Sequence, residues 1–277
     1  MLGKLMKHEW LSTWKVPTAL CIYLGILTIL GCTSFVSPLW QSDNMVVQVI
    51  AGFSIFIYIL SLIGICIAIF AYFVVRFYRN MYTDEGYLMH TLPVKSWEHI
   101  LTKGLTFFIW SLISVLAVFF SIFSIIFSAA LSVSGINWGD FFSQLQEFWP
   151  EIMREFQAFW GTSLATTIIL CIVAAICQLI FSILMIYGSI SIGQTFNRHK
   201  VMASFIAYVC LNMVLSLVRS LLQIPLLLIR TEQLDRFTSV SSILGPSFWM
   251  NLVMNGIGIV VFYLITQIIM QKKLNLD

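Results

Sequence analysis

The sequence predicts an all-α, polytopic membrane protein with six transmembrane helices. Of the 277 residues, 60% are apolar and only 10% are charged, whereas about a quarter of the residues of a soluble domain are charged. The charges fall between long apolar runs, which is the pattern of a chain that crosses a bilayer repeatedly. The net charge of +3 is too small and too scattered to suggest nucleic acid as a partner. We expect residues 1–277 to form a single transmembrane domain.

Six apolar runs are long enough to span a membrane, since a helix needs about 20 residues to cross about 30 Å of hydrocarbon. The predicted spans are residues 17–38, 46–75, 104–133, 162–190, 201–229 and 247–270. Most of the 15 Lys and Arg residues lie on the side that holds both termini. The positive-inside rule therefore predicts cytoplasmic termini.

Two segments outside the spans are amphipathic. Residues 1–15 repeat apolar side chains at helical spacing, with Glu9 and the basic residues largely elsewhere around the helix, which predicts an N-terminal interfacial helix on the cytoplasmic side. The alternative is a plain positively charged flank. Residues 135–161 predict an extracellular amphipathic helix, which either rests on the outer leaflet or forms a lid over an exit. The apolar stripe of the first is Leu2, Leu5, Met6, Trp10 and Trp14, and that of the second is Phe141, Leu145, Phe148, Ile152, Phe156 and Phe159.

Polar residues within the spans are few. Asn212, Ser216, Arg219 and Gln223 recur at steps of four, three and four on one face of the fifth span. A charge inside a span is costly, so Arg219 is a candidate for the substrate pathway and for contact with an acidic group. The alternatives are snorkelling to the outer interface and a structural hydrogen-bond network. The serines of the third span (Ser114, Ser121, Ser124 and Ser128) favour close helix packing.

The sequence offers no catalytic or metal site. All six cysteines lie in apolar runs without ligand spacing, and the predicted spans contain no Asp, Glu or His. These features argue against an intramembrane protease and make an ion-driven secondary transporter the weaker alternative. No Gly-x-x-x-x-Gly-Lys-Ser/Thr string is present to bind a nucleotide, so we expect neither enzyme activity nor a cofactor in this chain.

The segment 76–103 is the most informative part of the sequence. Glu85-Gly86, followed by Leu92-Pro93-Val94, Ile100-Leu101 and Lys103, resembles the first cytoplasmic loop of the membrane subunits of type-two ATP-binding cassette (ABC) exporters. That loop has the form Glu-x-Gly-Thr, Leu-x-x-Pro and a trailing Lys; here Tyr87 stands where Thr is usual. The wider string is similar to permeases of Gram-positive bacteria, including bacteriocin-immunity permeases and exporters of phenol-soluble modulin peptides.

The resemblance implies a membrane permease in the bacterial plasma membrane that exports amphipathic or hydrophobic peptides. It further implies that a separate ABC ATPase subunit binds ATP and Mg²⁺, and that two permeases assemble, as a homodimer or with another permease. The alternative role is self-immunity, in which bacteriocins or lantibiotics are cleared from the membrane. The loop would carry a coupling helix that docks on the ATPase through Asp84, Glu85, Gly86, Tyr87, Leu88, Thr91, Leu92 and Pro93.

Overall fold

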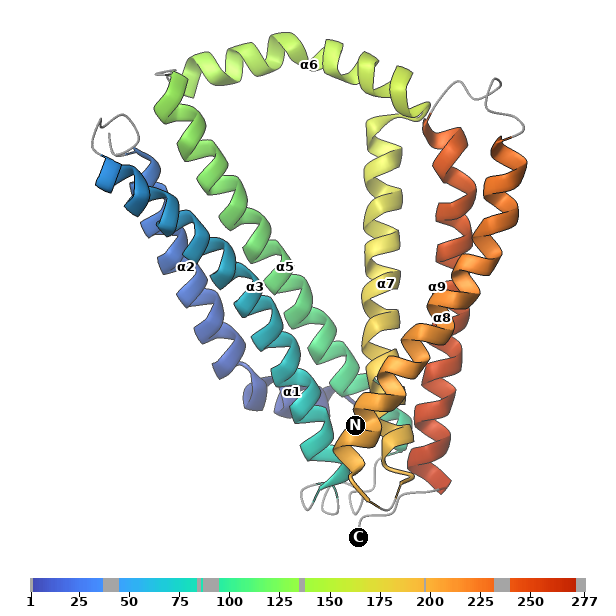
Figure 1. The fold of residues 1–277 in the computed structure, drawn as a ribbon. Coiled ribbons are helices and arrows are strands. Elements are labelled where there is room, and N and C mark those ends of the chain that lie inside the picture. The colour runs from blue at the N-terminus through green and yellow to red at the C-terminus, as the bar shows by residue number, and fades with distance from the viewer. Residues whose placement is uncertain are drawn as a thin grey trace. The chain divides into compact units, whose positions relative to one another are not determined.

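The computed structural model describes residues 2–36, 45–83, 86, 95–134, 138–196, 198–231 and 240–272. Within these ranges all regular structure is helical (Figure 1). The helices are α1 (Leu2–Thr13), α2 (Lys15–Val36), α3 (Met45–Tyr82), α5 (Ser96–Ser134), α6 (Trp138–Trp160), α7 (Leu164–Gly193), α8 (Lys200–Thr231) and α9 (Val240–Lys272).

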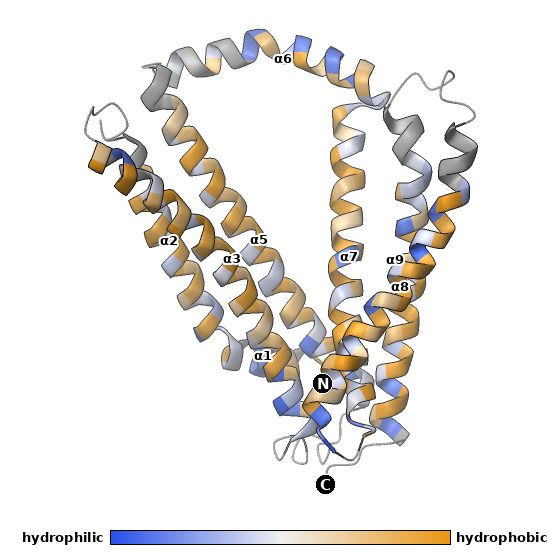
Figure 2. Ribbon diagram, in the orientation of Figure 1, coloured by the Kyte–Doolittle hydropathy of each residue, from blue (hydrophilic) through white to orange (hydrophobic). Residues whose placement is uncertain are grey.

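Six of these helices, α2, α3, α5, α7, α8 and α9, are long and apolar enough to cross a membrane. Their apolar character is visible along most of their length in Figure 2. The predicted all-α fold with six membrane-spanning helices is therefore confirmed. The sidedness of the termini remains a prediction.

The helices are longer than the predicted spans. α3 has 38 residues and α5 has 39, so each is about 57 Å long at about 1.5 Å per residue. The coupling loop was expected to include residues 76–82 and 96–103, but these residues belong to α3 and α5. Neither stretch contains a Gly or Pro that would interrupt a helix. α3 ends where the Thr83 hydroxyl donates to the Arg79 carbonyl at 2.5 Å. At the start of α5, the Lys95 N–H donates to the Glu98 carboxylate at 3.2 Å.

The chain divides into two compact units. Unit 1 is Met1–Phe77 with Leu101–Ser143, and unit 2 is Tyr78–Ile100 with Gln144–Asp277. In unit 1, hydroxyl groups join α5 to its neighbours: Ser121 bonds Thr28 of α2 at 2.6 Å and also bonds Tyr58 of α3. Ser128 donates to the Cys32 carbonyl of α2 at 3.1 Å. Ser121 and Ser128 thus have the helix-packing role predicted for the serines of this span.

In unit 2, α7 contacts both α8 and α9. Their buried cluster is formed by Phe181, Met185 and Phe262, which are 3 to 4% exposed. A β-carbon at Gly258 of α9 would overlap the Phe181 ring, so the absence of a side chain at Gly258 allows α9 to lie against α7. Close approach through small residues is the usual way in which membrane helices pack.

The predicted amphipathic segment before the fourth span is one continuous 23-residue helix, α6, despite Pro150 in its interior. Phe148, Ile152 and Phe159 of its predicted apolar face are between 45 and 64% exposed. The apolar face is therefore available for a bilayer or a ligand, which fits either interpretation of this segment.

Candidate functional site

A buried cluster of three charges holds α1 against α3 and α5. The Glu9 carboxylate lies 3.0 Å from Arg76 Nε and 3.3 Å from Lys103 Nζ. The side chains of Glu9, Lys103 and Arg76 are 7%, 5% and 18% exposed. We call these three residues the Glu9 cluster. Arg76 also donates from Nη2 to the Ser12 hydroxyl at 2.8 Å, so it contacts α1 at two points.

The electrostatics of the Glu9 cluster favour the ionised carboxylate. Burial raises the pKa of Glu9. The charges of Lys103 and Arg76 and their hydrogen bonds together outweigh this effect, so the pKa of Glu9 lies below its ordinary value of 4.5. One negative and two positive charges leave the cluster with a net positive charge. An aromatic contact supports the same docking, since Trp10 stacks on Trp110 of α5 with centroids 5.1 Å apart.

The docked face of α1 carries most of the predicted apolar stripe, and Glu9 lies on it. Leu2, Leu5, Met6 and Trp10 are half-buried and only Trp14 is exposed, at 45%. Glu9 and Thr13 are buried on the same face of the helix. Glu9 was expected largely away from the apolar stripe. It is buried because two cations, one from α3 and one from α5, replace the water that the carboxylate would lose.

Of the eight predicted docking residues, only Gly86 lies within the described part of the chain. Asp84, Glu85, Tyr87, Leu88, Thr91, Leu92 and Pro93 fall outside it. The Gly86 N–H donates to the Thr83 carbonyl at 2.7 Å. A β-carbon at Gly86 would lie 2.6 Å from the Met81 carbonyl oxygen, so this close approach to the end of α3 requires glycine.

The end of α3 next to this segment is fixed within unit 2. The Tyr82 hydroxyl bonds the Ser191 hydroxyl of α7 at 2.6 Å, and both residues are buried. Ser191 in turn donates to the Tyr187 carbonyl. The helix that leads into the predicted coupling segment is therefore tied to α7 by a buried polar contact.

A second polar site lies inside the spans of unit 2. Arg219 Nη2 of α8 donates to Asn255 Oδ1 of α9 at 2.7 Å, and Asn255 Nδ2 donates to Gln178 Oε1 of α7 at 2.8 Å. The Arg219 guanidinium also lies over the Phe181 ring, 5.2 Å from its centroid, which is a cation–π distance. We call Gln178, Arg219 and Asn255 the Arg219 network.

The predicted stripe on the fifth span is only partly brought together. Asn212 and Ser216 are exposed and bond carbonyls of their own helix, those of Tyr208 and Met213. Gln223 is half-buried. Arg219 instead donates a hydrogen bond to Asn255 of α9. This contact agrees with the alternative prediction that Arg219 belongs to a structural hydrogen-bond network. Asn255 and Gln178 were missed, although an amide inside an apolar run is itself a signal for an interhelical bond.

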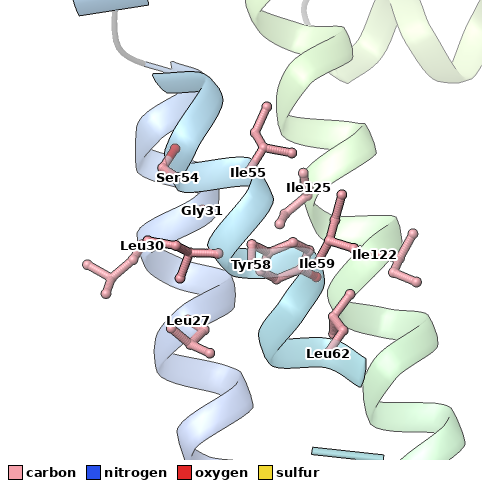
Figure 3. A pocket seen from close by; sticks show the side chains of 11 residues that line it. Leu27, Leu30, Gly31, Ser54, Ile55, Tyr58, Ile59, Leu62, Ile122 and Ile125 are labelled. Atoms are coloured by element: carbon pink, nitrogen blue, oxygen red, sulfur yellow. The ribbon is translucent and has the colours of Figure 1, made fainter. Parts of the chain in front are cut away.

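An apolar cavity of about 510 Å³ opens between α2, α3 and α5 in unit 1, a size within the range of about 300–1,000 Å³ typical of ligand pockets. Its lining is mostly aliphatic, with Tyr58 and Ser54 as polar members (Figure 3). The Tyr58 hydroxyl is engaged with Ser121. The cavity therefore suits an apolar chain rather than a polar ligand.

Comparison of the chain with models of protein families, with curated proteins and with solved structures finds no match.

Proposed function

We propose that the chain is the membrane-spanning permease subunit of an ATP-driven exporter of the ABC type, which moves amphipathic or hydrophobic peptides out of the cell or the membrane. ATP and Mg²⁺ bind on a separate ATPase subunit, and two permeases complete the transporter. The proposal is supported by the six apolar helices and by the resemblance of the segment around Glu85-Gly86 to the ATPase-docking loop of such exporters.

The observation that carries the proposal is the Glu9 cluster. It joins α1 to α3 and α5, the two helices that lead into and out of the predicted docking segment. Beyond the cluster, α3 continues from Arg76 to Tyr82 and α5 begins at Ser96, seven residues before Lys103. At about 1.5 Å per residue, each helix extends roughly 10 Å past α1.

This arrangement suits mechanical coupling. If α1 lies in the membrane interface, the ends of the two extensions at Tyr82 and Ser96 lie outside the hydrocarbon, within reach of a water-soluble ATPase. A displacement of the segment between these two ends would act on two continuous helices, and through the Glu9 cluster on α1 as well. Conformational coupling requires such a contiguous set of rigid elements.

The test is co-purification of an ATPase with the tagged full-length chain from its native host. Replacing Glu85 and Tyr87 together by Ala is expected to abolish the association and the ATP turnover. The matched control replaces one exposed acid and one exposed aromatic residue elsewhere, Glu151 of α6 and Phe119 of α5, and should leave both measurements unchanged. Undiminished association and turnover in the Glu85/Tyr87 variant would contradict the proposal.

A second candidate is an immunity permease that removes peptides from the outer leaflet. The exposed apolar side chains of α6, among them Phe159 at 64%, favour it, because they offer a surface for an amphipathic peptide on the predicted outer side. Transport of a peptide added outside, compared with release of one made inside, distinguishes the two roles.

A further inference from the structure

The Arg219 guanidinium carries a charge that no carboxylate neutralises in the part of the chain that the structure describes. Helices α7, α8 and α9 contain no Asp or Glu at all. The neighbours of Arg219 are the neutral amide of Asn255 and the ring of Phe181. A full positive charge inside a span is costly unless an anion or water compensates it.

The hydrogen bonds of the Arg219 network run in one direction. Since a guanidinium only donates, Asn255 must turn its oxygen toward Arg219 and its nitrogen toward Gln178, as observed. Both amide oxygens therefore accept within the network, while N–H groups of Gln178 and Arg219 remain. Arg219 Nε is buried without a hydrogen-bond partner, but the exposed Gln178 amide is accessible. What the network offers to a ligand is donors and positive charge.

The contacts of the Arg219 side chain argue against a lipid headgroup. Arg219 lies 19 residues after Lys200 and six before Pro225, about 28 Å and about 9 Å along the helix, so it is nearer the Pro225 end of the span. The side chain is held sideways against Asn255, which is 5% exposed, and Phe181, instead of extending along α8 toward the interface where lipid phosphates lie.

We infer that the Arg219 network binds the carboxylate of an amphipathic peptide, such as an acidic side chain, as the peptide passes along α8. The identification of the ligand as a peptide rests on the proposed function, whereas the preference for a carboxylate rests on the network itself. Asn255 positions the guanidinium, and Gln178 supplies a further N–H donor.

The experiment measures photo-crosslinking of a helical amphipathic peptide to the full-length chain in phosphatidylcholine nanodiscs. The peptide is amidated at its C-terminus and made in two forms, which carry either Glu or Gln at one position and are otherwise identical. Charge-assisted hydrogen bonds to the Glu form should raise its yield about tenfold over the Gln form. Arg219→Gln, which can still donate to Asn255, should abolish this preference.

Two further variants separate binding from folding. Asn255→Asp supplies a carboxylate at the position of Oδ1, 2.7 Å from Arg219 Nη2, so it should remove the Glu preference while the melting temperature stays equal or rises. Arg154→Gln removes one positive charge from the exposed surface of α6 and should leave the preference intact. Equal yields for the two peptides in the wild-type chain, or a preference that survives Arg219→Gln, would overturn the inference.

A lipid arm tests the competing ligand. If phosphatidylglycerol in the nanodisc abolishes the Glu preference, the network binds headgroup phosphates and the inference is wrong; a retained preference supports it. Failure of the proposed function is separately visible. A Glu preference in a chain that co-purifies with no ATPase would support the carboxylate site and contradict the exporter. Co-purification of an ATPase without a Glu preference would support the exporter and contradict the carboxylate site.

Discussion

The Glu9 carboxylate of α1 lies 3.3 Å from the Lys103 ammonium of α5, with both side chains more than nine-tenths buried. A helix of 12 residues is marginal by itself in water. The position of α1 therefore depends on what it docks against, and this ion pair, shared with Arg76, is the polar part of that docking.

Replacing Glu9 by Gln should destabilise the protein, because Arg76 and Lys103 then lose the carboxylate that lies 3.0 and 3.3 Å from them. Loss of one partner from a buried ion pair costs on the order of 3 kcal/mol. Thermal unfolding of the purified chain in detergent measures the effect. Glu147→Gln on exposed α6 is the matched control and should change little. Equal melting temperatures for Glu9→Gln and wild type would contradict a stabilising role.

Stability should also depend on pH through Glu9. Its pKa in the folded chain is lowered below 4.5, so the unfolded state binds the proton more readily. The stabilisation is fully present above about pH 4.5 and is lost as the pH falls through the folded pKa. Melting temperatures of wild type and Glu9→Gln, recorded from neutral to acidic pH, should therefore converge on the acidic side. A gap of constant size across that range would show that the carboxylate is not responsible.

Gly86→Ala should disturb the segment that follows α3. The added β-carbon would lie 2.6 Å from the Met81 carbonyl oxygen, and relieving such a contact costs roughly 1–3 kcal/mol locally. Faster cleavage of this segment in limited proteolysis is the expected result, together with weaker ATPase association. Gly139→Ala, where a β-carbon meets nothing within 4 Å, is the control. Unchanged cleavage would mean that the backbone accommodates the methyl group.

Gly258→Ala should weaken the packing of α9 on α7. The new methyl group would overlap the Phe181 ring, and overpacking of this kind costs about 1–3 kcal/mol. Combining it with Phe181→Leu should recover part of the loss. Gly256→Ala on the same helix, with open space around its β-carbon, should be nearly neutral. Equal melting temperatures for the two Gly→Ala variants would argue against a close contact at Gly258.

The six spans were predictable because a membrane-spanning helix is one continuous segment. Its two requirements, length and apolar character, can be read directly from consecutive residues. The serines at positions 121 and 128 were predictable for a similar reason, since small hydroxyl residues in a span favour helix contacts. The helix boundaries were less so: α3 continues through Arg76 and Arg79 because nothing in the local sequence stops it.

The two polar sites could not be fully predicted. Whether Glu9 faces water or protein depends on Arg76 and Lys103, which are 67 and 94 positions away. Helical periodicity places Glu9 four residues after Leu5 and three after Met6, on the side of the apolar stripe, but it cannot reveal the two cations on other helices. Arg219 was found because a lone charge in a span is conspicuous. Its partner Asn255, and Gln178 to which Asn255 donates, are neutral amides on other helices, and the periodicity of one helix cannot pair them.

The separation of Glu9 from its partners along the chain has a consequence for biosynthesis. Glu9 is made first, Arg76 near the end of the second span and Lys103 near the start of the third, so α1 must wait for these spans before it can dock. All three charges have to emerge on the same side of the membrane. A chain that inserted with the wrong number of early crossings would separate Glu9 from Arg76 and Lys103 across the membrane, so α1 would stay undocked.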